Sequence, residues 1–249
     1  MASRSATGGF GLNGDRPAPV FLDRFDLGGV GGVVVVVDVL RAFSTAAYAF
    51  GAGATAIHLV AGLDEAVTLG RSIPGAVVMG EDHGRKPVAY DLPNSPYLVS
   101  RAELTGREVV LRTSAGTQGA LAATGADRLF VTGLATASAT ARAVSACGIG
   151  APAYVLSGWQ ADWDAEDDRL TAEHVEAIRS GVPADPTAVA AAVRRTPEAF
   201  RTLEAGPGNM DPRDVDLAVD VDHFDFAMEV VRSEGRATID LVRPGVRTR

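Results

Sequence analysis

The sequence predicts an α/β protein built on a largely parallel or mixed sheet. Short apolar runs rich in valine alternate with Ala-rich stretches of helical character over most of the chain. This alternation is typical of βαβ units, in which helices cover a mainly parallel sheet. A chain of 249 residues can bury a sizeable core. We therefore expect a single domain over residues 29–249, or two intimately packed lobes within that range.

Strand-like and helix-like segments follow one another in order from Val33. The expected strands are residues 33–39, 55–60, 76–80, 107–113, 127–133 and 152–158. The expected helices between them are residues 41–54, 63–73, 114–125 and 135–148. Beyond Trp159 the sequence becomes acidic and amphipathic and is interrupted by prolines, which predicts mostly helix. The tail, residues 220–244, is expected to add a last helix and a short strand.

Composition limits the partners and the location of the protein. Residues 1–28 are Gly-rich and lack the apolar core of a signal peptide, so we expect a flexible lead-in, and no run is long enough to span a membrane. Cys147 is the only cysteine, which excludes an intrachain disulfide and favours the cytoplasm. A formal net charge of -8 argues against a nucleic-acid partner but leaves room for a small anionic ligand. Ala-rich residues 135–146 could pack against a second copy in a homo-oligomer.

The first candidate site follows the valine run Val33–Val37. Asp38 lies at the expected carboxyl end of this buried strand, and Arg41 would open the next helix. In open α/β sheets, ligands bind outside the carboxyl ends of the strands. A carboxylate there can bind a hard cation, and a guanidinium can bind phosphate or sulfonate oxygens. The alternative is that Asp38 only caps the helix and pairs with Arg41.

A long polar loop after the expected strand 76–80 is the second candidate. A loop of this length and polarity, directly after a buried strand, is rarely a simple connector. The alternative is a solvated loop whose Asx and proline turns cap a helix at Tyr97. The polar residues of this loop are Glu81, Asp82, His83, Arg85, Lys86, Asp91, Asn94 and Ser95.

The third candidate is the segment Leu111–Ala120, which is expected to run from a strand through a small-residue turn into a helix. Backbone amides and hydroxyl groups at such a turn can bind an anion. The segment has neither a Walker A motif nor G-x-G-x-x-G, so nucleotide binding has little support. The residues at the expected turn are Thr113, Ser114, Gly116 and Thr117.

An acidic run, Trp163–Asp168, precedes the next expected helix and is the fourth candidate. Acids at a helix start are favourable in themselves, and metal ligation by Glu166 or Asp167 is the functional alternative. The histidine spacings do not fit a zinc site, and no motif supports a serine or cysteine nucleophile. Carboxylates, an arginine and helix N-termini at one sheet edge are what Mg²⁺-assisted phosphoryl chemistry requires.

Several spaced motifs, taken in order, resemble those of the 2-phosphosulfolactate phosphatase (ComB) family over roughly residues 33–181. The motifs are DVLRA from Asp38, GE from Gly80 with its Gly/Arg loop, DLPNSP from Asp91, TSAGT from Thr113, and the Glu166–Asp167 pair. The resemblance implies a three-layer α/β/α fold. It also implies Mg²⁺-dependent hydrolysis of 2-phosphosulfolactate to sulfolactate and phosphate, a step towards coenzyme M.

The resemblance, read with the chemistry of the residues, gives a set of expected roles. We expect Mg²⁺ to be held by Asp38 and Glu81, with Glu166 or Asp167. The nucleophile is either a water molecule or Asp38 itself. The residues expected in catalysis are Asp38, Arg41, Glu81, Asn94 and Ser95. Those expected to bind the substrate are Arg41, Arg85, Asp91, Asn94, Thr113, Ser114, Gly116 and Thr117.

Three positions depart from the family pattern. Asp82 stands where the family has arginine, Ala115 where it has asparagine, and Phe43 where it has a small residue. The first two departures remove groups that could bind a substrate with two anionic groups, although Arg85 or Lys86 could compensate. Two alternatives therefore stay open: a catalytically silent or diverged anion-binding homologue, and a phosphatase of a different small phosphoester.

Overall fold

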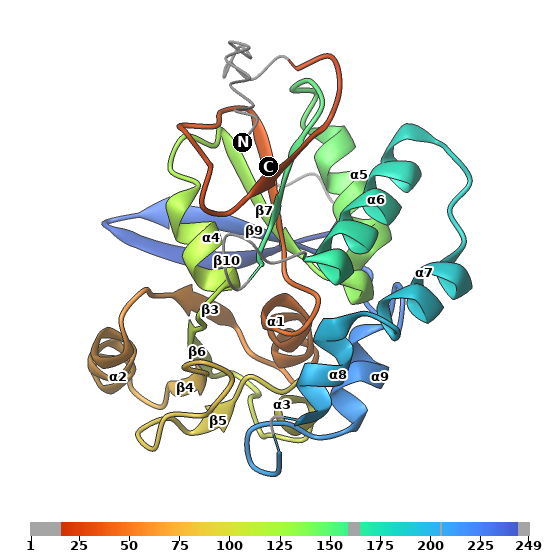
Figure 1. Cartoon of the computed structure of the whole chain (residues 1–249). Coiled ribbons are helices and arrows are strands. Elements are labelled where there is room, and N and C mark those ends of the chain that lie inside the picture. Colours follow the sequence, from red (N-terminus) through yellow and green to blue (C-terminus); the bar gives the residue numbers. More distant parts are fainter. Residues whose placement is uncertain (1–15, 159–164, 205, 244–249) are drawn as a thin grey trace, which may run out of the picture.

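The fold was obtained as a computed structural model that describes residues 16–158, 165–204 and 206–243 (Figure 1). Its described strands form one large curled sheet in the order β1-β8-β2-β7-β9-β10-β3-β6-β4-β5. Most neighbouring strands are parallel, and only the pairs that involve β9 or β10 are antiparallel. The expected α/β class with a largely parallel sheet is confirmed.

Strands and helices alternate through the first two thirds of the chain, and the helices then follow one another. The strands are β1 (Val20–Asp23), β2 (Val33–Val37), β3 (Ala56–Leu59), β4 (Val77–Gly80), β5 (Leu92–Pro93), β6 (Glu108–Arg112), β7 (Arg128–Thr132), β8 (Ala153–Leu156), β9 (Ala227–Ser233) and β10 (Arg236–Val242). The helices are α1 (Ala42–Gly51), α2 (Leu63–Ser72), α3 (Pro96–Ser100), α4 (Gly116–Ala122), α5 (Ala137–Ala146), α6 (Glu166–Ser180), α7 (Pro186–Val193), α8 (Pro197–Glu204) and α9 (Arg213–Ala218), with a 3₁₀ turn η1 (Leu134–Thr136).

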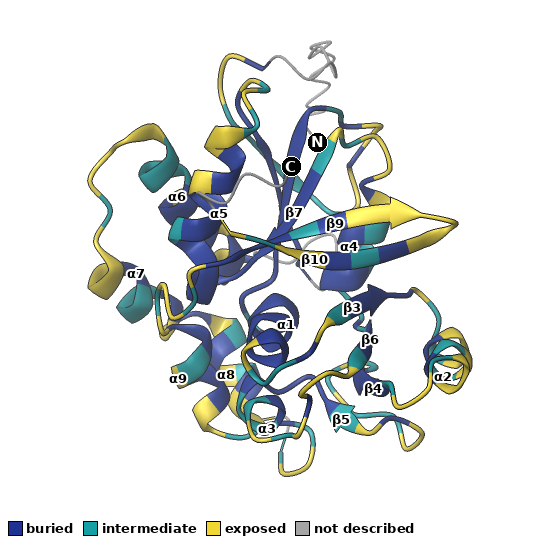
Figure 2. Ribbon diagram, turned by 180° about the vertical axis from the view of Figure 1, so that it is seen from behind, coloured by how far each residue is buried: buried dark blue, intermediate teal, exposed yellow. Residues whose placement is uncertain are grey.

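The valine run of β2 is buried because helices cover both faces of the sheet around it. Side chains alternate across a strand, so Val34 and Val36 join the core that includes α1 and α4. Val33, Val35 and Val37 join the core formed with α5 and α6. This arrangement is the expected three-layer α/β/α fold. Every residue from Ala42 to Phe50 of α1 is buried, and Figure 2 shows this helix in the interior of the molecule.

The tail forms a hairpin inside the sheet, and the expected last helix there is wrong. β9 and β10 pair antiparallel through Glu234 and Gly235, whose φ angles of 51° and 76° are those of a tight two-residue hairpin turn. The hairpin lies between β7 and β3 and so joins two parallel groups of strands. Its apolar alternation places Met228, Val230, Ala237 and Ile239 in the core, whereas the residues next to the turn are exposed.

Part of the expected lead-in belongs to the fold. Residues 1–15 lie outside the described residues, but β1 pairs parallel with β8 at the edge of the sheet. The Arg16 guanidinium is buried and donates to the carbonyl oxygens of Ala151, Gly31 and Val33 at 3.2, 2.8 and 3.0 Å. The structured chain therefore begins well before residue 29. Among the helices that the structure describes, none is long and apolar enough to cross a membrane.

Candidate active site

A cavity of about 370 Å³ lies at the carboxyl ends of the parallel strands. Four of its residues directly follow a strand, as the rule for open α/β sheets predicts. These are Asp38 after β2, Glu81 after β4, Asn94 after β5 and Ser157 after β8. The charged side chains that line the cavity are Asp38, Arg41, Glu81, Arg85, Asp167, Asp168, Glu198, Arg201 and Glu204, with His83.

Asp38 is a buried carboxylate that lies just before the start of α1 and lines the cavity. Its Oδ1 accepts a hydrogen bond of 2.8 Å from the Ala42 amide, so it does cap α1. Burial raises the pKa of Asp38 to about 7, and the charge of Glu81 adds to this effect against the hydrogen bonds from the Ala42 and Gly116 amides. Asp38 therefore both caps a helix and presents a costly buried charge to the cavity.

Two neighbouring acids at the start of α6 add to the negative charge. Asp167 and Asp168 are both buried. Burial, followed by the charges of Glu198 and Asp38, raises the pKa of Asp167 well above its usual value. Burial and the charges of Asp167 and Asp38 do the same to the pKa of Asp168. Asp168 accepts hydrogen bonds of 2.9 Å from the amides of Val39 and Ser157, so it also ties β2 to β8.

Glu81 holds the loop after β4 against the loop after β6. Its Oε2 accepts from the Gly84 amide at 2.7 Å and from the Ser114 hydroxyl at 3.1 Å, and its Oε1 accepts from the Ser114 amide. Asp82 and Arg85 exchange backbone hydrogen bonds of 2.8 and 3.0 Å around His83 and Gly84. Both central residues have positive φ, as a tight two-residue turn requires. This turn brings His83, Gly84 and Arg85 to the cavity.

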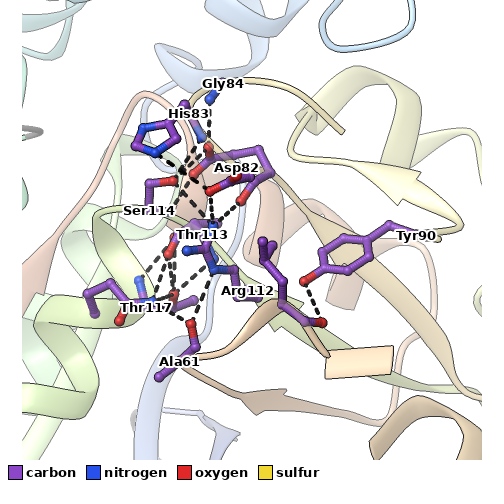
Figure 3. A network of polar contacts seen from close by, with 12 residues as sticks. Ala61, Asp82, His83, Gly84, Tyr90, Arg112, Thr113, Ser114 and Thr117 are labelled. Carbon is purple, nitrogen blue, oxygen red and sulfur yellow. Dashed lines mark hydrogen bonds and ion pairs between the residues drawn. The ribbon is translucent and has the colours of Figure 1, made fainter. Parts of the chain in front are cut away.

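Asp82 stands beside the cavity and does not line it. Its Oδ1 accepts a hydrogen bond of 3.0 Å from Arg112, as Figure 3 shows. The same Arg112 Nη1 also donates to the Glu81 carbonyl at 2.8 Å and to the Ser114 hydroxyl at 3.3 Å, while its Nε donates to the Ala61 carbonyl at 3.2 Å. The acid at position 82 is therefore neutralised outside the cavity.

The turn before α4 contributes less to the cavity than expected. Thr113 and Thr117 are buried and bond to each other's backbone amides at 2.8 and 3.1 Å, which closes the start of the helix. The Ser114 hydroxyl already takes part in three hydrogen bonds, from His83 and Arg112 and to Glu81, which uses its full capacity. Of this turn, Ser114 and Ala115 line the cavity, whereas Thr113, Gly116 and Thr117 do not.

The loop after β5 supplies one cavity residue and two structural ones. Asn94 is buried, lines the cavity, and its Oδ1 has no hydrogen-bond partner within the described part of the chain. Asp91 accepts from the Val78 amide at 2.8 Å, and Ser95 caps α3 by accepting from the Leu98 amide at 3.2 Å. Asp91 and Ser95 are not among the lining residues, so for these two the turn-and-cap alternative describes what the structure shows.

Three of the remaining expected residues line the cavity, and one does not. Arg41 lines the cavity and pairs with Asp214 at 3.2 Å, not with Asp38 as the capping alternative required. Arg85 and Asp167 line the cavity. Glu166 is exposed at the first position of α6 and is not a lining residue. Trp163 and Asp164 of the acidic run lie outside the described residues.

Comparison with known proteins identifies the family of this chain. The family model described as 2-phosphosulpholactate phosphatase matches residues 23–203. The chain belongs to the 2-phosphosulfolactate phosphatase family. Members of this family are phosphoric monoester hydrolases by name, and the resemblance of the spaced motifs is thereby confirmed.

Curated relatives of the 2-phosphosulfolactate phosphatase family extend the match. A Thermus thermophilus protein named "Probable 2-phosphosulfolactate phosphatase" is 32% identical over 81% of this chain and 85% of its own length. A Bacillus subtilis protein of the same name is 37% identical over 59% of this chain, and the match covers 64% of that protein, less than two thirds. A Thermoplasma acidophilum protein of the same name is 27% identical over 79% of this chain and 85% of its own length.

Several polar residues that line the cavity are not marked by the motifs in the sequence. Ser157 directly follows β8 and lies near the carboxyl end of the strand predicted over residues 152–158, so the carboxyl-end rule could have found it. Its buried Oγ has no partner within the described chain. Asp168 could have been found only by knowing where the helix after the acidic run begins and which of its faces is buried. No local signal marks Glu198 or Arg201, because they reach the cavity from α8 through tertiary packing.

The donor set fits a hard divalent cation in its chemistry. Six carboxylates and three guanidinium groups line the cavity, and the buried acids raise one another's pKa. Among the residues that the structure describes, no three carboxylate, histidine or cysteine side chains already converge as a metal site. Mg²⁺ often uses only one or two carboxylates, with waters and substrate phosphate completing its shell. Oxygen ligands of this kind are present here.

Proposed function

We propose that the protein is a Mg²⁺-dependent phosphatase of a small acidic phosphoester, 2-phosphosulfolactate in particular, with sulfolactate and phosphate as products. One observation carries this proposal: buried Asp38 shares a cavity of about 370 Å³ with Glu81, Asp167 and Arg41 at the carboxyl ends of the sheet. Membership of the family and the names of the relatives support the substrate class. The excess of acids over arginines in the cavity favours a bound cation beside an anionic phosphoester.

Asp38 and Asp167 are the residues that would hold Mg²⁺. Glu81 lies close enough for its charge to raise the pKa of Asp38. When bound, Mg²⁺ acts as a Lewis acid on phosphoryl oxygens and offsets their charge. Asp168 is less available, because both of its oxygens already accept backbone hydrogen bonds. Glu166 is exposed and drops out of the proposed ligand set.

The remaining cavity residues would bind and orient the substrate. Guanidinium groups bind phosphate and sulfonate oxygens through paired N–H donors, so Arg41 and Arg85 are the proposed anion-binding groups. The buried side-chain oxygens of Asn94 and Ser157 have no partner among the residues that the structure describes, and unpaired buried polar atoms are costly unless a ligand or water satisfies them. The attacking group is either a water molecule or the Asp38 carboxylate, and both routes require Asp38 in the cavity.

The test measures phosphate release from 2-phosphosulfolactate and from an aryl phosphate, with and without Mg²⁺. We expect turnover of the phosphosulfolactate that requires Mg²⁺ and that falls at least 1,000-fold, on the order of losing a central catalytic group, in Asp38→Asn. The control is Asp127→Asn, because Asp127 accepts from the Gly32 amide at the opposite ends of the strands. Phosphate binding without turnover of either substrate would instead identify a catalytically silent anion-binding homologue. Turnover of the aryl phosphate alone would indicate a phosphatase of a different ester.

A further inference from the structure

Asp214 of α9 is a fully buried carboxylate whose two oxygens accept four hydrogen bonds. Its Oδ2 accepts from Arg41 Nη1 at 3.2 Å and from the Asp211 amide at 3.0 Å. Its Oδ1 accepts from the Ser95 hydroxyl at 2.6 Å and from the Tyr97 amide at 2.9 Å. A carboxylate offers about four lone-pair positions, so Asp214 is saturated by the protein and has one fixed orientation.

Two of these donors belong to loops that build the cavity. Arg41 comes from the loop after β2 and lines the cavity. Ser95 comes from the loop after β5 and directly follows Asn94, another lining residue. One buried carboxylate thus fixes the position of two loops that meet at the site, although Asp214 itself is not a lining residue.

Asn209 extends the same anchoring to a third loop. Its carbonyl oxygen accepts from Arg41 Nη1 at 3.1 Å, and its side-chain Oδ1 accepts from the Lys86 amide at 2.9 Å. Lys86 directly follows Arg85, which lines the cavity. The segment 209–214 therefore contacts the loops after β2, β4 and β5. This segment lies beyond residues 23–203, the part that the family model matches.

The bonding of Arg41 leaves a defined part of its guanidinium for a ligand. Nη1 is used by Asp214 and Asn209, whereas Nε and Nη2 have no acceptor among the described residues. A guanidinium binds an oxyanion with two N–H groups in a fixed fork. The hydrogen bonds to Nη1 fix the orientation of Nε and Nη2 and leave both free to donate to a ligand. The side chain therefore loses less conformational entropy when the ligand binds.

We propose that Asp214 is a positioning residue that holds Arg41 in the orientation in which it binds the phosphate group of the substrate. The proposal rests on the proposed function in one respect only, that Arg41 is an anion-binding group of the cavity. Asp214 touches no substrate in this scheme and acts through Arg41.

The test measures binding of inorganic phosphate by calorimetry in the presence of Mg²⁺, which requires no turnover. The variants are Arg41→Ala, Asp214→Asn and the double variant. Asp211→Asn is the matched control, because within the described part of the chain its side chain accepts hydrogen bonds only from exposed Arg213. We expect Arg41→Ala and Asp214→Asn each to weaken binding roughly 10-fold, about the loss of one charge-assisted contact. The double variant should bind as Arg41→Ala does, because residues that act through one another are not additive.

The opposite pattern overturns the proposal. If Asp214→Asn binds phosphate as the parent does, or if the two losses multiply in the double variant, Asp214 does not act through Arg41. If Arg41→Ala binds normally, Arg41 is not the anchored anion-binding group. Should Asp214→Asn fail to fold, Ser95→Ala replaces it, since it removes one donor from the same carboxylate and is expected to show the same non-additivity with Arg41→Ala. Failure of the proposed function would show separately, as phosphate binding by the parent without turnover.

Discussion

Gly116 lies so close to Asp38 that a Cβ atom on the glycine would stand 2.5 Å from Asp38 Oδ2. The same Cβ would be 2.8 Å from the Cβ of Ala42. Neither neighbour can move easily, because Asp38 is buried and its Oδ1 is bonded to the Ala42 amide. The first residue of α4 is therefore a glycine for reasons of space, and its small size lets the helix approach the carboxylate.

Gly116→Ala is expected to lower the proposed phosphatase activity more than it destabilises the fold. The added methyl group must displace Asp38, and a shift of about 1 Å in a catalytic group can cost on the order of 100-fold in rate. The overpacking cost of about 1–3 kcal/mol is partly offset by the better helix propensity of alanine. Phosphate release and chemical unfolding measure the two effects. Gly119→Ala is the control, since a Cβ there meets Val36 at 3.2 Å and stays in ordinary contact, at 3.6 Å, with the cavity residue Ser157, without approaching Asp38. Equal losses of activity in both variants would contradict the prediction.

Mg²⁺ is expected to stabilise the parent protein against unfolding through Asp38 and Asp167. A ligand that binds only the folded state at 100 times its Kd adds about 2.7 kcal/mol, which a thermal or urea unfolding titration with MgCl₂ resolves. Asp38→Asn and Asp167→Asn should each remove most of this increment, whereas Glu166→Gln, at an exposed position, should keep it. An increment that survives in both aspartate variants would place the cation elsewhere.

The metal-free protein is expected to lose stability as the pH rises from about 4 to about 7. The pKa of Asp38 is raised by burial from 3.8 to about 7 in the folded protein. Between these values the folded state holds a proton that the unfolded state has released, so the free energy of unfolding falls with increasing pH. Above pH 7 the loss of unfolding free energy no longer grows. At 1.36 kcal/mol per pKa unit, the shift of Asp38 gives a total loss of up to about 4 kcal/mol.

Asp38→Asn should remove this part of the pH dependence, so that the variant is more stable than the parent at pH 8 and similar to it near pH 4. Urea unfolding in EDTA across this range is the measurement, with Asp127→Asn as the control that keeps the parent's slope. A difference between parent and Asp38→Asn that does not change with pH would show that the carboxylate is not buried as a charge.

The fold could be predicted from the sequence where the structure is local. The valine run gave β2 and placed Asp38, because five buried residues in a row followed by a carboxylate can be recognised without knowing the neighbours. The hairpin β9–β10 was missed because its burial depends on pairing with β7 and β3, far away in the chain. Asp214 was missed for the same reason: its partners Arg41 and Ser95 are 173 and 119 residues away, and no sequence spacing records that contact.

Arg112→Gln is expected to damage the site more than Asp82→Asn, although the two side chains form one ion pair at 3.0 Å. Arg112 also donates to the carbonyl oxygens of Glu81 and Ala61 and to the Ser114 hydroxyl. Its loss leaves acceptors unpaired and loosens the turn that carries Glu81, at a cost of about 1–3 kcal/mol. We also expect a fall in turnover of roughly 10-fold or more from the displaced carboxylate.

Asp82→Asn removes only a partly exposed charge outside the cavity, and exposed ion pairs contribute about 0–1 kcal/mol. Turnover in this variant should stay within about threefold of the parent, because its amide oxygen can still accept from Arg112. Both variants are compared by urea unfolding and by phosphate release. If Asp82→Asn lost as much activity as Arg112→Gln, the charge at position 82 would act on the substrate directly, and its position beside the cavity would not isolate it from the chemistry.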